Sequence, residues 1–349
     1  MTVTATTPTT VPPVLEVADL VTTYPAPPRD VLGRPRGTVQ AVSSVSLSVA
    51  PGETVGVVGE SGCGKSTLGR SVLGLERTDA GTVRICGQDV LGMRGRTSRA
   101  LRAHAQMVFQ DPFACLNPRL TVADLIAEPL KIHRRWDRAT GPDLVARLLG
   151  EVGLEREHGD RYPHEFSGGQ RQRIGIARAL ALQPDLIVLD EPVSALDVSV
   201  QAGVLNLLDE LQQAHDLAYL FIAHDLSVVH HISDRIAVMY LGKIVEIGDA
   251  DVVYETPAHP YTTALLSAVP APDPRLERER QRVVLTGDVP RPTHPPSGCR
   301  FRTRCWKATE ICATEEPPLA GTPGRMVACH HPERPVPGSP ATAVPPPTD

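Results

Sequence analysis

The stretch GESGCGKST, residues 59–67, decides the fold of this chain. It fits the pattern G-x-x-x-x-G-K-[ST], whose glycines allow backbone N–H groups to surround phosphate oxygens. The apolar run TVGVV before it predicts a buried strand, and the run STLGRSVLGL predicts a helix. Because a phosphate-binding loop requires this order of strand, loop and helix, we expect a nucleotide site here rather than an unliganded glycine-rich turn.

The side chains of this loop have separate expected roles. Lys65 would reach the β- and γ-phosphates, and Ser66 would ligate Mg²⁺. Cys63 stands at a variable position of the pattern, so we expect a small filler side chain that is open to thiol reagents. The nucleotide-contacting residues predicted in this loop are Gly59, Glu60, Ser61, Gly62, Cys63, Gly64, Lys65, Ser66 and Thr67.

The run LIVLDE supplies the acidic groups that such a loop needs. A magnesium ion on a phosphate loop requires a carboxylate at the tip of a neighbouring strand. We expect Asp190 to hold the metal, directly or through water, and Glu191 to polarise the attacking water. An isolated Asp-Glu pair of this kind would more often be a solvated strand end, and the intact phosphate loop favours the functional interpretation.

The rest of the chain predicts an α/β fold of the P-loop NTPase type with a mostly parallel sheet. A segment at about 112–165, rich in charge and helix formers, would be a helical insertion between two strands. The loop PAPPRDVLGRPRG follows an early strand. The runs that predict strands are VLEVADLVTTY, ETVGVVG, DLIVLD, LAYLFIAH and the pair within RIAVMYLGKIVEIG.

Length and composition exclude several classes of protein. The 349 residues suit one large domain with an appendage, and a net charge of −5 argues against a dedicated nucleic-acid binder. We find no apolar run long enough for a membrane-spanning helix and no signal peptide, so we expect a cytoplasmic location. Seven cysteines there would be thiols or metal ligands rather than disulfides.

The proline distribution predicts domain boundaries. Of the 34 prolines, 17 follow residue 269. We therefore expect a main domain over 14–269, with a helical subdomain at about 112–180, and a small cysteine-rich module over 270–333. The ends, 1–13 and 334–349, are too poor in core-forming residues to fold alone and are expected to be disordered tails.

The run FSGGQRQRIGIARAL, residues 166–180, resembles the signature sequence of the ATPase subunits of ABC transporters. Taken alone, it reads as a helix N-cap with a glycine bend, which offers N–H groups and a helix dipole to an anion. The resemblance implies that two such domains close over two ATP molecules. Each signature would face the γ-phosphate of an ATP on the opposite subunit, through Ser167, Gly168, Gly169 and Gln170.

Four further positions match the family pattern one by one. The resemblance implies that Gln110 senses the metal and water and relays closure to the membrane partner. Asp197, which ends SALD, would lie in a loop that crosses the dimer interface. His224 would contact the γ-phosphate and Tyr24 would stack on adenine, although a structural histidine and an exposed tyrosine are the alternatives. The implied reaction is phosphoryl transfer from ATP to water.

The resemblance becomes closer to the oligopeptide and dipeptide importers over roughly residues 14–331, in runs such as MVFQDPFACLNPRLTV and HPYTTALLSAVP. It implies a subunit at the cytoplasmic face of the membrane. Its partners would be a second ABC ATPase subunit, in a heterodimer, two transmembrane permease subunits and an extracytoplasmic solute-binding protein. Nickel chelates or glutathione are alternative cargoes. A soluble ABC ATPase acting on DNA or ribosomes is disfavoured because the chain has neither a large insertion nor two ATPase halves.

Four cysteines in the tail run C-x5-C-x6-C-x16-C. They lack the short C-x2–4-C spacing of most structural zinc sites, and four thiolates can also hold an iron–sulfur cluster. The family resemblance implies a [4Fe-4S] cluster, with Zn²⁺, simple thiols or disulfides as alternatives and His330 and His331 as further ligands. We expect a structural role, and the predicted ligands are Cys299, Cys305, Cys312 and Cys329.

Overall fold

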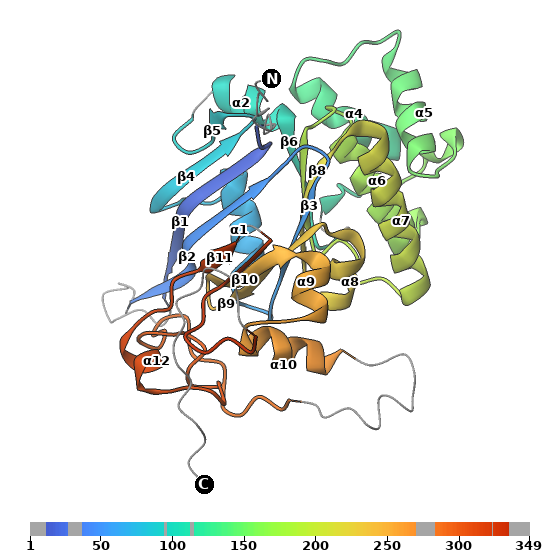
Figure 1. Ribbon diagram of the computed structural model, residues 1–349. Helices are drawn as coiled ribbons and strands as arrows, with labels where there is room; N and C mark the ends of the chain where they lie inside the picture. The colour runs from blue at the N-terminus through green and yellow to red at the C-terminus, as the bar shows by residue number, and fades with distance from the viewer. Residues whose placement is uncertain are drawn as a thin grey trace, which may run out of the picture.

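A computed structural model describes residues 12–26, 37–93, 96–111, 115–269, 283–322 and 324–334. The expected disordered tails lie almost wholly outside these ranges. So do most of the loop after the first strand and the expected boundary near Pro270. Within them the chain forms two sheets, a helical region on one side and a C-terminal segment at the bottom of the view in Figure 1.

The larger sheet is formed, among the described residues, by eight strands in the order β11-β12-β10-β9-β3-β8-β7-β6. The pairs from β9 to β6 are parallel, as the sequence predicts. Every residue of β3, β7 and β8 is buried, which explains why these strands read as continuous apolar runs. Their bounds are Thr54–Val58 for β3, Ala105–Val108 for β6, Leu186–Asp190 for β7, Ala218–Ala223 for β8 and Arg235–Tyr240 for β9.

A second sheet, which the sequence did not predict, has the order β2-β1-β4-β5 and is antiparallel. Helix α1 (Lys65–Val72) contacts strands of both sheets, and the core on this side takes side chains from both. The alternation of buried and exposed residues in β1 shifts at Asp19 and Leu20, where the pairing with β2 is irregular. The bounds are Leu15–Pro25 for β1, Thr38–Val49 for β2, Ala80–Ile85 for β4 and Gln88–Asp89 for β5.

The segment expected to be helical contains α4 (Val122–Ile132), α5 (Gly141–Glu151) and two short 3₁₀ turns, η1 (Arg156–Asp160) and η2 (Pro163–Glu165). These pack with α6 (Gly168–Leu180), which also contacts α7 (Val198–His215). In Figure 1 they form the group at upper right, beside the sheet. The other helices that precede the tail are α2 (Arg96–His104), α8 (Leu226–Ile232), α9 (Ala250–Glu255) and α10 (Pro260–Ala268).

The C-terminal segment returns to the larger sheet. Strand β12 (Arg325–Val327) pairs antiparallel with β10 (Lys243–Asp249), and β11 (Ala320–Thr322) pairs with β12. The buried Glu246 carboxylate fixes this edge, because it accepts from two backbone N–H groups and pairs with Arg325 at 3.5 Å. The tail beyond α12 (Glu310–Thr314) is therefore continuous with the core sheet.

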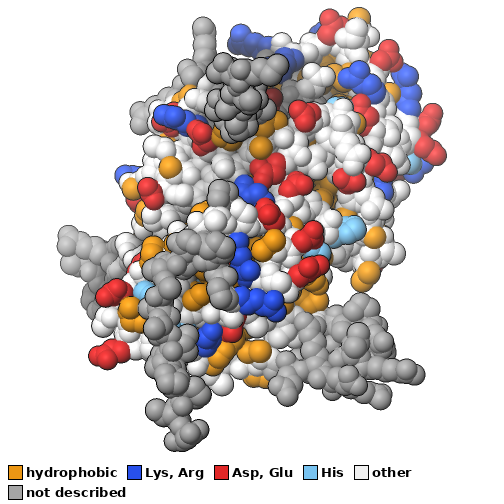
Figure 2. Space-filling view, viewed as in Figure 1, with side chains coloured by type: hydrophobic (Ala, Val, Ile, Leu, Met, Phe, Trp, Pro, Cys, Tyr) orange, Lys and Arg blue, Asp and Glu red, His pale blue; other side chains and the backbone are white. Residues whose placement is uncertain are grey.

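None of the helices in the described ranges combines the length and the apolar character needed to cross a bilayer. On the face shown in Figure 2, acidic and basic side chains are interspersed. This mixed surface matches the small net charge of the sequence.

Candidate nucleotide site

The parallel pairing brings four separate sequence motifs to one edge of the larger sheet. Val58 at the end of β3 is aligned with Ala223 of β8, and Asp190 of β7 with Ile222 of the same strand. The segments that follow these strand ends carry the phosphate loop, His224 and Glu191. Gln110 comes two residues after β6, the next strand along. Ser61 and His224, which are 163 positions apart in sequence, thus line one pocket.

The glycine-rich loop has the shape that its glycines permit. Gly64 has a φ of +109°, and a Cβ there would lie 1.9 Å from the Ala41 carbonyl oxygen. No other residue type fits this position, because both the backbone angle and the space exclude a side chain. The Lys65 Nζ donates to the Gly59 carbonyl at 2.7 Å and to the Glu60 carbonyl at 3.2 Å, which places its charge inside the loop.

Ser66 and Asp190 form the candidate magnesium site. The Ser66 hydroxyl donates to Asp190 Oδ1 at 2.7 Å. The other carboxylate oxygen, Oδ2, is buried without a hydrogen-bond partner among the described residues, and the Arg70 guanidinium is 4.0 Å away. Burial raises the pKa of Asp190, and a bound cation would favour its charged form. A hydroxyl and an unsatisfied carboxylate oxygen are the hard ligands that Mg²⁺ prefers.

Glu191 is held at the centre of the pocket by two side chains. The Gln110 amide donates to Glu191 Oε2 at 2.9 Å, and the His224 Nδ1 is 3.6 Å from the same oxygen. Glu191 also has a φ of +47°, in the left-handed region that costs a side-chain-bearing residue free energy. Its backbone N–H is fixed by the Ile222 carbonyl of β8 at 2.8 Å. A carboxylate held this way can orient a water molecule.

Most of these residues line a cavity of about 540 Å³, whereas Gly59, Glu60, Cys63 and Asp190 are not among its lining residues. Tyr24 is at its rim, where its hydroxyl is close to Thr67 and Glu76, and burial raises its pKa. The sequence did not predict three of the lining residues, Val39, Ala41 and Pro292, because no local motif marks them. Pro292 belongs to the C-terminal segment, and its carbonyl accepts from the Gln40 N–H at 3.1 Å.

The signature residues lie outside this cavity. Ser167 caps α6, since its hydroxyl accepts from the Gln170 N–H at 3.3 Å while the Gln170 side chain accepts from the Ser167 N–H at 3.0 Å. Asp197 caps α7 in the same way by accepting from the Val200 N–H at 2.9 Å. Gly169 packs against Val200, because a Cβ there would lie 2.2 Å from its side chain. The first residues of α6 and α7 are therefore neighbours and form one continuous surface.

The expectation that Cys63 is open to thiol reagents is wrong. Its side chain is 5% exposed, and burial raises the pKa of its thiol. The Cys63 side chain belongs to the core cluster that includes Leu68 and Met239, and it does not line the pocket. Its place in the loop is structural filling, as expected.

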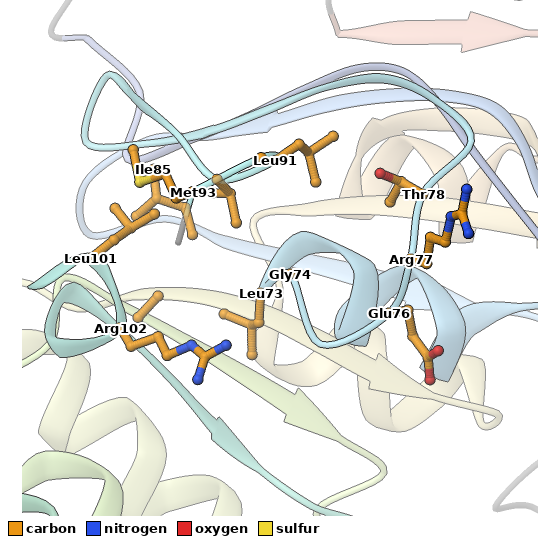
Figure 3. Close-up of a pocket in the computed structure, with 13 residues that line it drawn as sticks. Leu73, Gly74, Glu76, Arg77, Thr78, Ile85, Leu91, Met93, Leu101 and Arg102 are labelled. Atoms are coloured by element: carbon orange, nitrogen blue, oxygen red, sulfur yellow. The ribbon is translucent and has the colours of Figure 1, made fainter. Parts of the chain in front are cut away.

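Two other features of the described ranges lie away from this pocket. A cavity of about 240 Å³ next to α1 and α2 has a mixed lining, with apolar side chains such as Leu91 and Met93 beside Glu76, Arg77, Thr78 and Arg102 (Figure 3). Near it, the exposed side chains of Cys86, His104 and Asp185 have ligand atoms within 4.8 Å of one another. The His104 Nδ1 is hydrogen-bonded to Asp185 at 2.6 Å, which gives this group a partner without a metal.

Known proteins share both the fold and the sequence. A family model described as "ABC transporter" matches residues 42–194, and one described as "Oligopeptide/dipeptide transporter, C-terminal region" matches residues 245–312. A dimeric ABC transporter cassette of known structure has a TM-score of 0.60 and 26% identity, over 68% of this chain and 98% of that chain. The fold and pocket are therefore those of an ABC ATPase.

Curated relatives narrow this class. The putative oligopeptide transport ATP-binding protein YkfD of Bacillus subtilis is 53% identical over 91% of this chain and 95% of its own length. OppF of Salmonella typhimurium is 53% identical over 90% and 95%, and DppF of Pseudomonas aeruginosa is 51% identical over 85% and 91%. The chain belongs to the ATP-binding subunits of the oligopeptide and dipeptide ABC transporter family.

The geometry predicts that Glu191→Gln lowers ATP turnover by at least about 100-fold, the range for removing a general base. ATP binding should be retained, because the glutamine keeps the shape and the phosphate loop is untouched. Steady-state hydrolysis and nucleotide titration would measure the two effects. Glu210→Gln, an exposed change on α7, is the matched control. Turnover near wild type in Glu191→Gln would exclude Glu191 as the base.

Proposed function

We propose that this protein is the ATP-binding and ATP-hydrolysing subunit that energises an importer of dipeptides or oligopeptides. One observation carries the proposal: in a chain of this family, the phosphate loop and the held carboxylate of Glu191 line one cavity, and Ser66 in that lining is hydrogen-bonded to Asp190. The printed functions of its relatives, oligopeptide and di/tripeptide transport, support the choice of cargo.

The residues of the pocket have distinct proposed roles in hydrolysis. The loop N–H groups and Lys65 neutralise the charge that develops on the phosphates. Bound Mg²⁺, held by Ser66 and Asp190, would supply further charge neutralisation there. Glu191 accepts the proton of the attacking water, and Gln110 and His224 hold the carboxylate in place from two sides. Tyr24 provides the aromatic face for adenine.

We propose that two such subunits close over two nucleotides, this chain pairing with a second ABC ATPase subunit. The position of the capped start of α6 supports this, because Ser167 to Gln170 are outside the chain's own cavity. Their N–H groups and helix dipole can then act only on an anion that another subunit carries. Asp197 and the exposed Val198 at the start of α7 extend the same surface toward a partner.

Closure would be passed to two permease subunits through a second groove. This groove, about 250 Å³, runs between the sheet edge and the helical segment and includes the exposed apolar side chains of Leu75, Phe109 and Ile132. Phe109 directly precedes Gln110, which contacts Glu191. A permease helix bound in this groove would therefore be displaced when the contacts of Gln110 in the pocket change. Binding of this kind requires a location at the cytoplasmic face of the membrane.

Reconstitution into vesicles tests this function. The chain, co-purified with its permease subunits and supplied with a solute-binding protein, should accumulate labelled dipeptides or oligopeptides only when ATP is present. Glu191→Gln in the same complex should abolish accumulation. ATP-dependent uptake of nickel chelates or glutathione in place of peptides would refute the peptide assignment. Recovery with DNA or ribosomes instead of membranes would refute the transport role.

We further propose that residues 270–333 form a cysteine-rich module that holds a [4Fe-4S] cluster, beside an ATPase domain over 14–269 with its helical subdomain at about 112–180. All seven cysteines are free, which disfavours disulfides. Burial and the neighbouring thiols raise the pKa of Cys299 to about 11 and that of Cys329 to about 12. A bound metal would favour the thiolate forms at these positions.

The four tail cysteines are near neighbours, since the thiols of Cys299, Cys305 and Cys312 all contribute to the raised pKa of Cys329. Four thiolates brought together in this way can hold an iron–sulfur cluster. Cys299 and Cys312 are tied by a backbone hydrogen bond of 2.8 Å, so the site is preformed in part.

Anaerobic purification should give a protein that contains about four iron and four acid-labile sulfide atoms, as expected for a cluster on four thiolates. Cys305→Ser should lower both contents, whereas Cys115→Ser, outside the tail, should change neither. Zinc in place of iron, or no metal at all, would contradict the cluster assignment.

A further inference from the structure

The cysteine segment is joined to the phosphate loop by a fork-shaped ion pair. Arg304, next to Cys305, places both guanidinium nitrogens on the carboxylate of Glu60, at 2.8 Å for Nη1–Oε2 and 3.1 Å for Nη2–Oε1. The Arg304 side chain is 8% exposed and that of Glu60 is 27% exposed. Because this pair is bidentate and largely shielded from water, it fixes both the distance and the relative orientation of the two side chains. An exposed surface salt bridge would not do so.

The backbone of Glu60 is held from the same side. Its N–H donates to the Tyr261 hydroxyl at 2.8 Å, and Tyr261 is fully buried in α10. The ring of Phe301, which lies between Cys299 and Cys305 in sequence, packs against Tyr261 and Tyr240 with centroids 5.4 and 5.2 Å apart. The side chain of Glu60 is therefore held by Arg304 of the cysteine segment. The backbone of Glu60 is held by Tyr261, whose ring packs against Phe301 of the same segment.

A second pair of contacts joins the cysteine segment to the chain beside another part of the cavity lining. The Arg300 guanidinium donates to Gln40 Oε1 at 2.7 Å and also to the Leu241 carbonyl. Gln40 precedes Ala41, whose carbonyl limits the space at Gly64, and its N–H donates to the Pro292 carbonyl. The turn from residue 299 to 305 thus contacts Glu60 and Gln40, each of which is next in sequence to a residue that lines the cavity, Ser61 and Ala41.

We propose that Arg304 is a positioning residue for ATP binding, through which the folded cysteine segment holds the phosphate loop in its binding conformation. This inference rests on the proposed ATP site and adds a role for the tail beyond its own folding. The loop is rich in glycine and has a high conformational entropy when released. Because the Arg304–Glu60 pair orders the loop before ATP binds, less conformational entropy of the loop is lost on binding.

Titration of the full chain with MgATP tests the proposal, with Arg304→Ala compared to Arg302→Ala. Arg302 is in the same turn, and within the described part of the chain its side chain donates to Ser297 rather than to the phosphate loop, so it is the matched control. We expect the Kd and the KM for ATP to rise at least about tenfold in Arg304→Ala, as for a lost charge-assisted pair. The kcat at saturating ATP should change little, because Lys65, Glu191 and Gln110 are intact.

Three further tests separate positioning from simple loss of folding. Alkylation of the buried Cys63, followed by mass spectrometry, should speed up in Arg304→Ala if the loop is released. Glu60→Gln, which breaks the pair from the loop side, should weaken ATP binding without changing the metal content of the tail. Arg304→Lys should restore binding only in part, because an ammonium cannot make the fork. Wild-type affinity and Cys63 reactivity in Arg304→Ala and Glu60→Gln would overturn the proposal, while wild-type ATP binding itself would still support the proposed function.

Discussion

The parallel pairing of β3 with β8 on one side and β9 on the other is the constraint on which the site depends. Parallel strands end at the same edge, and their connections are free to carry chemistry there. With β7 beside β8, the segments after β3, β7 and β8 must meet. A slip of one residue in this register would turn every buried side chain of the three strands to the other face and separate Ser66 from Asp190.

Backbone strain and a buried polar atom without a hydrogen-bond partner occur, in the described part of the chain, at the two acidic residues that are expected to take part in hydrolysis. Glu191 adopts a positive φ, and Asp190 has a buried oxygen without a hydrogen-bond partner in the described part of the chain. Both features cost stability, and the surrounding sheet must offset them. A ligand that satisfied Asp190 would recover part of this cost, so the folded state is prepared for a cation and its nucleotide.

The tail is more closely joined to the ATPase than its proline-rich sequence suggests. Strand β12 extends the same sheet that carries the phosphate loop, and Phe301 packs in the core under that loop. Arg304 then connects the turn between two cysteines to Glu60. The C-terminal segment, which has few apolar residues, thereby packs against the core of the ATPase. In return, its Arg304 holds the phosphate loop through Glu60.

The sequence predicted the parts of the site that are local in sequence and left out those that are not. The phosphate loop, LIVLDE and the start of α6 each carry a complete motif, and the strands of the parallel core could be read as buried apolar runs. The antiparallel sheet, Pro292 at the cavity wall and the Arg304–Glu60 pair depend on contacts between distant segments. The expectation that Cys63 is open to thiol reagents was wrong, because its burial depends on core residues from distant segments that the loop motif does not mark.

The claim that the converging strands form a single MgATP site can be tested directly by calorimetric titration of ATP with and without magnesium. The wild type should bind MgATP and lose much of its affinity in excess EDTA. Asp190→Asn should remove most of this magnesium dependence, because it removes the charged ligand opposite Ser66. Equal ATP affinity with and without magnesium in the wild type, or an unchanged dependence in Asp190→Asn, would contradict the account.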